Sequence, residues 1–352
     1  MTESGVKSVD QVDVKPKKQY KIGIARALHF YKYYPIWKAF LENLGCKVVL
    51  SPLTNKEIME QGCKVASGEL CIPMKIYYGH VIELLNKQKD LDYIFIPRYV
   101  SLDKESYFCP KFMILPETIK YVVHPSVKIL TLEVNAKSFQ GIEGALKVGK
   151  ELGFSQMETG KAWMVAIDKF KNFKRAVQKE DYLEQLFGHK VKSKPIKQTI
   201  REDIRGKYPV TIAVLGHAYN VYEKSLNMDM HERLKSMDCK VVTMEMLPEE
   251  EFKKDVYINK QYRNYWGNCE EILQAARYFL TKGRDQVDGI LFLISFACGP
   301  DSLVSEIIMR DMKKRNIPFQ SIIMDEHTGE SGLVTRVESF VEMIRRKKYQ
   351  LQ

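Results

Sequence analysis

The feature that most constrains the fold is an alternation of short apolar segments with amphipathic helical segments, which occurs twice along the chain. The strand-like segments are 20–24, 47–50, 93–96 and 127–132 in the first half, and 210–215, 240–243, 289–294 and 319–324 in the second. The helical segments are 31–44 and 74–85, then 223–237, 269–280, 302–314 and 332–346. This alternation is typical of α/β units on a mostly parallel sheet. We therefore predict two small doubly wound α/β domains.

The 352 residues are enough for two such domains. We predict a polar tail over 1–19, an N-terminal α/β domain over 20–136, and a C-terminal α/β domain with a closing helix over 208–352. Between them, 137–207 is predicted to be a helical segment followed by a basic linker. The basic stretch 190–207 has two interpretations, a solvated connector or a phosphate-binding patch.

The charge balance and the missing motifs limit the function classes. The 55 Lys and Arg residues outnumber the 44 Asp and Glu residues, for a net charge of +11, which suits an anionic cofactor or an acidic partner. The chain lacks the GxGxxG, GxxxxGK(S/T), GxSxG and HExxH patterns, which argues against P-loop enzymes and serine hydrolases. We also predict no nucleic-acid partner, no membrane association and a cytoplasmic location, because RNA-binding, transmembrane and secretory signatures are missing from the sequence.

Three of the seven cysteines stand in a context that suits metal binding. Cys71, Cys109 and Cys298 fall in loops at the predicted carboxyl ends of strands, and Cys71 and Cys298 adjoin predicted helix N-termini, where the helix dipole favours a thiolate. Thiolates in such places suit a soft metal or an iron–sulfur cluster. The alternative is that they are buried packing thiols, since a lone cysteine usually belongs to a core.

The other four cysteines have weaker indications. Cys63 and Cys269 are reserve ligands, whereas Cys46 and Cys239 each precede a strand and are predicted to pack in a core. The sequence contains neither a CxxC pair nor the Cys and His spacing of a structural zinc site.

Several polar residues near these cysteines are candidates for chemistry. His217 follows a strand-end glycine and is a catalytic candidate, although a histidine there also commonly satisfies a loop carbonyl. Lys75 and His80 lie on the helix after Cys71, where they would meet an anion if a cluster is present and otherwise face solvent. Glu69, just before Cys71, is a cofactor-binding candidate together with His80. The segment 325–330 (DEHTGE) has two interpretations, a catalytic or metal-binding group and a cap of the last helix by Thr328.

These residues belong to motifs that together resemble a known family. The stretches are GELCIPMK, YFCPK, WGNCEEILQAARYFL, ISFACGPDS and DEHTGESGLVTR, and the likeness extends from about Lys21 to Ile344. The sequence resembles the 2-hydroxyglutaryl-CoA dehydratase superfamily, in particular the acyl-CoA dehydratase activase-related proteins, also called CoA-substrate-specific activase-related proteins.

The resemblance implies two flavodoxin-like or Rossmann-like parallel-sheet domains with a helical insert between them. It implies that Cys71, Cys109 and Cys298 ligate a 4Fe–4S cluster in which one iron has no protein ligand. A larger iron–sulfur cluster is the alternative. It also implies a partner, an ATP-dependent activator of the actin-like ATPase fold that carries its own iron–sulfur cluster and supplies low-potential electrons. An acyl-CoA substrate and a dimer are further expectations.

On this interpretation, His217 and Lys75 are catalytic candidates, and His80 and Glu69 bind the cofactor. The chain departs from the family in two places, since Arg98 stands where many relatives have a further cysteine and Ala218 stands where GHPYN is usual. The activity remains open between a 2-hydroxyacyl-CoA dehydratase-like component and an ATP-dependent reductase component. Two alternatives also remain, a non-catalytic accessory module of such a system and a double-cubane-type small-molecule reductase.

Overall fold

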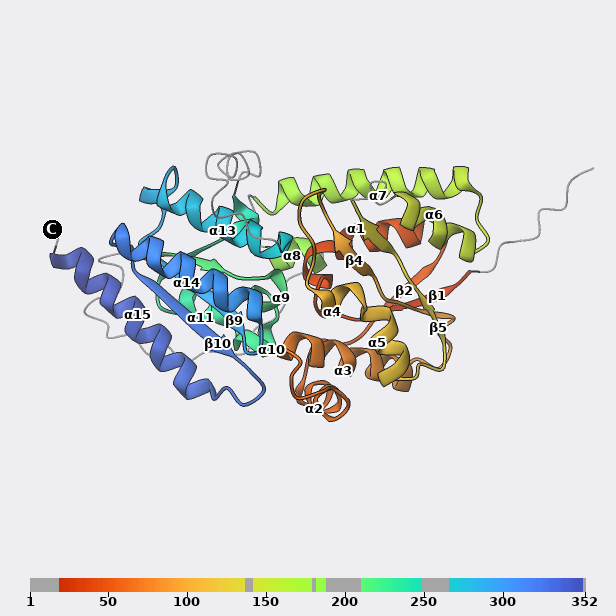
Figure 1. Cartoon of the computed structure of the whole chain (residues 1–352), viewed down its shortest axis with the longest axis horizontal. Coiled ribbons are helices and arrows are strands. Elements are labelled where there is room, and N and C mark those ends of the chain that lie inside the picture. The colour runs from red at the N-terminus through yellow and green to blue at the C-terminus, as the bar shows by residue number, and fades with distance from the viewer. Residues whose placement is uncertain (1–18, 137–141, 179–181, 188–209, 248–265, 351–352) are drawn as a thin grey trace, which may run out of the picture.

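The computed structural model describes residues 19–136, 142–178, 182–187, 210–247 and 266–350. Figure 1 shows two halves side by side along the long axis of the molecule, an N-terminal half (19–187) and a C-terminal half (210–350). The predicted basic linker 190–207 and nearly all of the predicted tail 1–19 lie outside the described residues.

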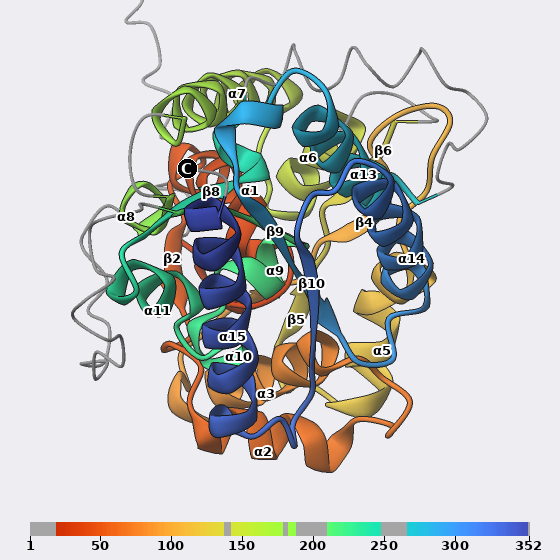
Figure 2. The same cartoon turned by 90° about the vertical axis from the view of Figure 1, so that its left-hand side faces the viewer.

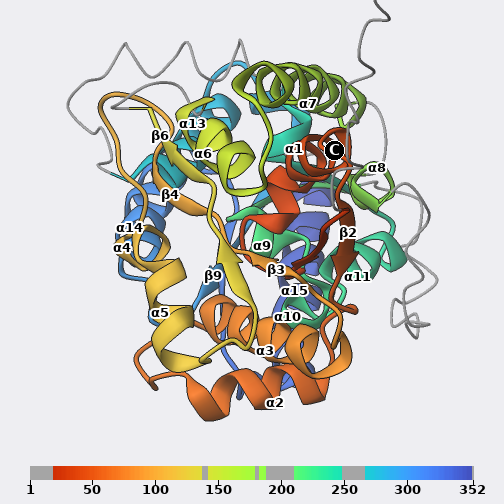
Figure 3. The same ribbon diagram turned by 90° about the vertical axis from the view of Figure 1, so that its right-hand side faces the viewer.

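The N-terminal half is built on a four-stranded parallel sheet in the order β2-β1-β3-β5. Its strands are the predicted apolar segments, and helices pack on both of its faces because both faces are apolar. Helix α1, with α7 outside it, lies on one side, and α3, with α2 outside it, lies on the other (Figure 3). The bounds are β1 Lys21–Ile24, β2 Lys47–Leu50, β3 Tyr93–Phe95, β5 Lys128–Leu130, α1 Phe30–Asn43, α2 Lys56–Val65, α3 Ile72–Lys87 and α7 Gln156–Ala176.

A second, two-stranded parallel sheet in this half was not predicted. Strand β4 (Arg98–Ser101) pairs with β6 (Glu133–Asn135), and both are too short to give an alternating pattern that can be read from sequence. The helical character predicted after Ala136 is found in α6, α7 and α8, and α7 begins with a capping box at Ser155. The remaining bounds are α4 Pro110–Met113, α5 Leu115–Val122, α6 Ile142–Glu151 and α8 Tyr182–Phe187.

The C-terminal half repeats this architecture with a parallel sheet in the order β10-β9-β7-β8. Helices α13 and α14 cover one face, and α11 and α15 cover the other (Figure 2). The predicted α/β class with parallel sheets is thereby confirmed. The bounds are β7 Val210–Leu215, β8 Cys239–Thr243, β9 Gly289–Ser295, β10 Phe319–Met324, α11 Met230–Ser236, α13 Gly267–Leu280, α14 Gly299–Lys314 and α15 Glu330–Gln350, with short 3₁₀ turns η1 Met244–Met246 and η4 Arg284–Gln286.

The hydrophobic core follows from the alternation of side chains along β9. Ile290 and Phe292 point toward α13 and α14 and belong to one apolar cluster, whereas Leu291 and Leu293 point the other way. Leu291 and Leu293 belong to a second apolar cluster, which also contains the core of the N-terminal half. Within the part of the chain described here, no helix is both long and apolar enough to cross a membrane.

The helix predicted over 223–237 is wrong as a single element. The chain forms α9 (Ala218–Val221), α10 (Lys224–Asn227) and then α11, with Met228 and Asp229 in the left-handed region at φ 54° and 57°. The Asn227 side chain causes the break, because its amide donates to the carbonyls of the preceding helix and its oxygen accepts from the Met230 N–H at 3.2 Å. Asparagine readily offers such local alternatives to helical bonding.

Candidate metal centre

Four cysteines line one cavity of about 150 Å³ at the seam between the two halves. Cys71 and Cys109 come from the N-terminal half, and Cys269 and Cys298 come from the C-terminal half. The three predicted cysteines are half-buried, whereas Cys269 is 2% exposed. The other residues that line this cavity are Met74, Lys111, Phe112, His217, Tyr219, Trp266, Asn268, Ala297, Gly299 and Pro300.

The three predicted cysteines share one local structure. Cys71, Cys109 and Cys298 are the N-cap residues of α3, α4 and α14, and each of these helices carries a proline in its first two positions. Proline is favoured there because its missing N–H is not needed. The positive dipole ends of α3 and α14 therefore lie at the cavity, where they favour negative charge.

Burial raises the pKa of every thiol in the cavity above its usual value of 9.0. For Cys71 the Lys111 ammonium and the Met74 N–H act in the opposite direction and favour the thiolate. For Cys298 the nearby Asp301 carboxylate raises the pKa further. The cavity without metal therefore holds neutral thiols, and metal binding must release their protons.

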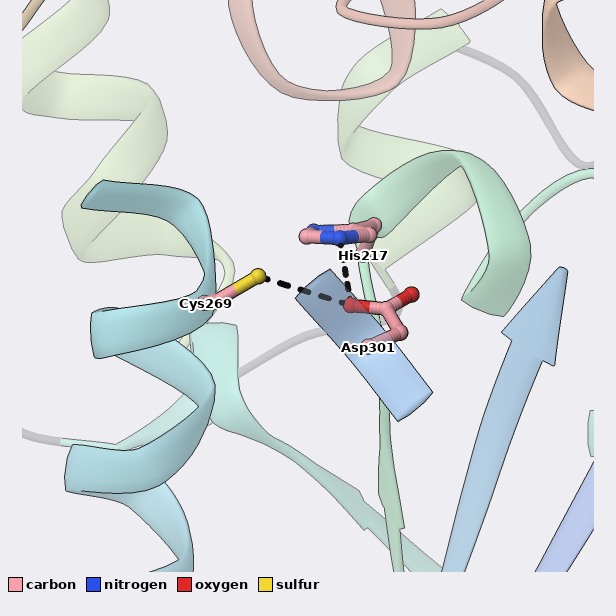
Figure 4. Close-up of side chains that lie close together, drawn as sticks. All are labelled: His217, Cys269 and Asp301. Atoms are coloured by element: carbon pink, nitrogen blue, oxygen red, sulfur yellow. Dashed lines mark hydrogen bonds and ion pairs between the residues drawn. The ribbon is translucent and has the colours of Figure 1, made fainter. Parts of the chain in front are cut away.

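A buried carboxylate outside the lining joins two residues that line the cavity (Figure 4). Asp301, on the first turn of α14, is fully buried, and its Oδ1 lies 2.9 Å from Nε2 of His217 and 3.5 Å from Sγ of Cys269. The three donor atoms all lie within 4.8 Å of one another. The other carboxylate oxygen of Asp301, Oδ2, is buried without a hydrogen-bond partner. These residues could hold a metal ion directly or could orient the sulfur ligands beside them.

His217 is positioned by the end of β7. Gly216 there has φ 146°, and a Cβ at this position would stand 2.8 Å from the carbonyl oxygen of Leu293, so only glycine fits. The His217 ring is 6% exposed and stacks on Tyr219 with 4.9 Å between ring centroids. Of the four polar residues predicted for catalysis or cofactor binding, His217 lies in the cavity lining.

Lys75, His80 and Glu69 are not among the residues that line the cavity. Lys75 is buried and forms an ion pair with Glu326, which belongs to the loop after β10. Glu69 is exposed in the turn before α3. The helix that begins at Cys71 carries Lys75 and His80 into the body of the protein, because Cys71 caps it and the helix axis leads away from the cavity.

His80 belongs to a separate buried network that joins the two halves. Its Nε2 lies 2.8 Å from the Thr54 hydroxyl, which donates to Oε2 of Glu223 at 2.7 Å, and the Tyr31 hydroxyl donates to the same oxygen at 2.6 Å. Burial lowers the pKa of His80 to about 3, with a further contribution from Arg26, and burial raises the pKa of Glu223. This network of buried polar groups ties α1 and α3 to the C-terminal half.

The structure also places three further residues that the sequence analysis discussed. Thr328 does not cap the last helix, because its hydroxyl donates to Asp325 Oδ1 and accepts from the Asp325 N–H, both at 2.8 Å, within the turn after β10. Arg98 forms ion pairs with Glu117 and with Glu133, the latter at 3.8 Å. Cys63 lies on α2 outside the cavity lining.

Sequence reasoning gave Cys269 only a reserve role and gave Asp301 none. Cys269 stands in WGNCEEILQAARYFL, one of the stretches that carry the family resemblance, but no predicted strand comes directly before it as one does before Cys298. Asp301 was visible as the last residue of the CGPD motif, and its place on the first turn of a helix could have drawn attention to it.

Comparison with known proteins gives the family. Residues 21–247 match the model of the CoA enzyme activase uncharacterised domain (DUF2229). No curated protein matches the chain. A solved structure titled "Nitrogenase Cp1 at pH 5" aligns over 96% of this chain and 59% of its own, with 10% identity and a TM-score of 0.24, a likeness too low to bear on fold or chemistry. The chain thus spans less than two thirds of that protein. Because the family match extends over more than half of the sequence, the chain belongs to the CoA enzyme activase uncharacterised domain family.

Proposed function

We propose that the protein binds an iron–sulfur cluster in the four-cysteine cavity and transfers electrons through it. One observation carries this proposal: Cys71, Cys109 and Cys298 are far apart in sequence, belong to different halves, and nevertheless line the same cavity. Packing thiols have no reason to gather in this way, since unrelated core cysteines are distributed among many apolar contacts.

The donor set fits such a cluster. Thiolates are the ligands that hold iron–sulfur clusters, and the lining offers four of them. The cavity of about 150 Å³ is several times the roughly 30 Å³ that one water occupies in the liquid, so it offers more room than a single ion needs. The helix ends at Cys71 and Cys298 and the Lys111 side chain place positive charge against an anionic thiolate cluster.

When bound, the cluster supplies one-electron chemistry at a potential set by its surroundings. The protein residues hold it, exclude water and set its charge environment. Asp301 holds the His217 ring at 2.9 Å and lies beside Cys269, so this pair would orient the sulfur ligands around it. Because the thiols come from both halves, cluster binding would also fasten the two halves to each other.

The proposed electron donor is an activator protein, as the family description suggests. We propose, more specifically, the ATP-dependent activator with its own iron–sulfur cluster, and an acyl-CoA reaction of the 2-hydroxyglutaryl-CoA dehydratase superfamily downstream of it. The cavity lies close to the molecular surface, because Phe296, two residues before Cys298, is 61% exposed. A donor docked over this loop would come close to the cluster, and the net charge of +11 suits an acidic docking face.

The test is iron and acid-labile sulfide per chain after anaerobic purification. We expect about four of each in the wild type. Cys71→Ala, Cys109→Ala and Cys298→Ala should each hold less metal than the wild type. Cys46→Ala is the matched control, since Cys46 is buried 25 residues before Cys71 in the core of the same half. Metal-free wild type, or equal iron in all variants after anaerobic reconstitution, would rule the proposal out.

A second candidate, a small-molecule reductase of the double-cubane type, is favoured by a larger cavity nearby. This cavity of about 290 Å³ is lined mainly by apolar and aromatic side chains, among them Phe170, Phe173 and Tyr182. A smaller cavity shares lining residues with it and with the cysteine cavity. Calorimetric titration with benzyl alcohol tests it: binding that Phe173→Ala abolishes and Phe296→Ala leaves intact would support the candidate, and no binding by the wild type would remove it.

A further inference from the structure

We propose that Cys269 is the fourth thiolate ligand of the centre, so that every iron has a protein sulfur and the cluster serves electron transfer without an open iron for substrate. This inference rests on the proposed function and contradicts one expectation from the sequence, a three-cysteine site with an open iron. It follows from how the structure places the start of α13.

The start of α13 is held against the loop that carries Cys109. Trp266 forms a parallel β-bridge with Tyr107, and the Gly267 N–H donates to the Tyr107 carbonyl at 2.9 Å. Tyr107 is two residues before Cys109, and Gly267 is two residues before Cys269. This contact crosses between the two halves, and it fixes the position of Cys269 relative to Cys109.

A second contact places Cys269 beside Cys298. Asp301 is three residues after Cys298 on the first turn of α14, and its Oδ1 lies 3.5 Å from the sulfur of Cys269. Helices α13 and α14 pack side by side on the same face of the sheet. Cys269 is therefore held from two sides, and its sulfur faces the cavity that the other three thiols line.

The thiols of the cavity also affect one another's pKa values. Cys109 raises the pKa of Cys71, and Cys71 raises that of Cys298, in both cases after the larger effect of burial. Burial also raises the pKa of Cys269, with Asp301, Cys298 and Cys109 adding to it. The four thiols therefore lie near one another around the cavity that they line.

The other possible ligands fit less well. His217 Nε2 and Asp301 Oδ1 already contact each other at 2.9 Å, and an oxygen ligand is harder than the sulfur that iron–sulfur clusters take. Cys63 is not in the cavity lining, and the groups that affect the pKa of its thiol after burial are Glu326 and Lys75, not another cysteine. Cys269 is the remaining thiol of the lining once the three predicted ligands are assigned.

The test uses the full-length protein, purified anaerobically and loaded with iron and sulfide. Ferricyanide is added, and iron released to a chelator and the electron paramagnetic resonance spectrum are recorded. An iron without a thiolate leaves as Fe²⁺ when the cluster gives one electron to ferricyanide, and a three-iron cluster remains. We expect the wild type to keep its iron, whereas Cys269→Ala should release about one quarter of it and show the three-iron signal.

Cys63→Ala, the same substitution at the other reserve cysteine, should behave as the wild type. Cys269→Ser keeps the size of the side chain and should also release iron, which keeps the test valid if the alanine variant does not fold by circular dichroism. If the loaded wild type releases one iron as readily as Cys269→Ala, or if Asp301→Asn but not Cys269→Ala produces the three-iron signal, Cys269 is not the ligand. If the wild type never takes up iron, the proposed function itself fails.

Discussion

Helices α2 and α3 touch through two glycines, and this contact gives a sharp prediction about the element that carries Cys71 (Figure 3). A Cβ on Gly79 would stand 1.9 Å from the carbonyl oxygen of Ile58, and a Cβ on Gly62 would stand 1.9 Å from that of Lys75. Real Cβ atoms do not approach other atoms closer than about 3 Å, so Gly79→Ala must push the two helices apart by about 1 Å.

The size of the effect follows from two opposing terms. Overpacking a tight contact costs roughly 1–3 kcal/mol, and here the obstacle is backbone that cannot rotate away. Alanine returns at most about 1 kcal/mol, because it is the better helix former. Because the obstacle is backbone, the cost lies near its upper value, and about 3 less about 1 leaves about 2 kcal/mol of destabilisation for Gly79→Ala. Iron loading should also fall, since a shifted α3 moves its N-cap residue Cys71.

Gly160 provides the matched control. It lies inside α7, and a Cβ there would have nothing within 4 Å. The same substitution should therefore raise stability by about 0.4–1 kcal/mol. The assay is the urea midpoint of the metal-free protein, followed by iron content after reconstitution. If Gly79→Ala shifts the midpoint upward as Gly160→Ala does, the α2–α3 contact is not as tight as the structure shows and the reasoning fails.

Three further predictions concern the buried polar groups and the metal. The folded protein holds the pKa of His80 at about 3, against 6.5 in the unfolded chain. The neutral His80 ring therefore contributes its full share of the free energy of unfolding above pH 6.5, and this contribution is lost as the pH falls toward 3. In urea titrations, His80→Gln should weaken that pH dependence by about 1.4 kcal/mol per pH unit; an unchanged slope would contradict this. Asp301→Asn should lower cluster affinity by roughly 10–100-fold in a chelator competition while leaving the circular dichroism spectrum unchanged, and an unaltered affinity would show that Asp301 orients no ligand. Removing the metal should lower the melting temperature of the wild type by about 4 °C and that of Cys71→Ala by less. A metal present at 100 times its Kd contributes about 2.7 kcal/mol, and a chain of this length loses roughly 0.7 kcal/mol of stability per degree near its melting temperature.

The sheets and most helices could be predicted because their signals are local. A run such as GILFLI is apolar on both sides and becomes β9, buried throughout between two helical layers. The break at Met228 could not be predicted in the same way, since Asn227 produces it through carbonyls that only the folded α9 brings within reach. Strands β4 and β6 have three or four residues each and exist because they pair with each other.

The cysteine site likewise has one part that local sequence patterns predict and one part that only the folded structure shows. A cysteine in the loop at the carboxyl end of a predicted strand is a local pattern, and it singled out Cys71, Cys109 and Cys298, of which Cys71 and Cys298 adjoin predicted helix N-termini. This pattern does not find Cys269, which lies three residues into α13. Its place in the cavity depends on the bridge between Trp266 and Tyr107, a contact between the two halves. The prediction that placed Lys75 and His80 beside the cysteines shows the opposite error. Both residues are near Cys71 in sequence, but Cys71 caps α3 and the helix carries them away from the cavity. In a protein whose site lies at the seam of two halves, distance along the chain from a known ligand says little, and the docking of the halves decides which thiols meet.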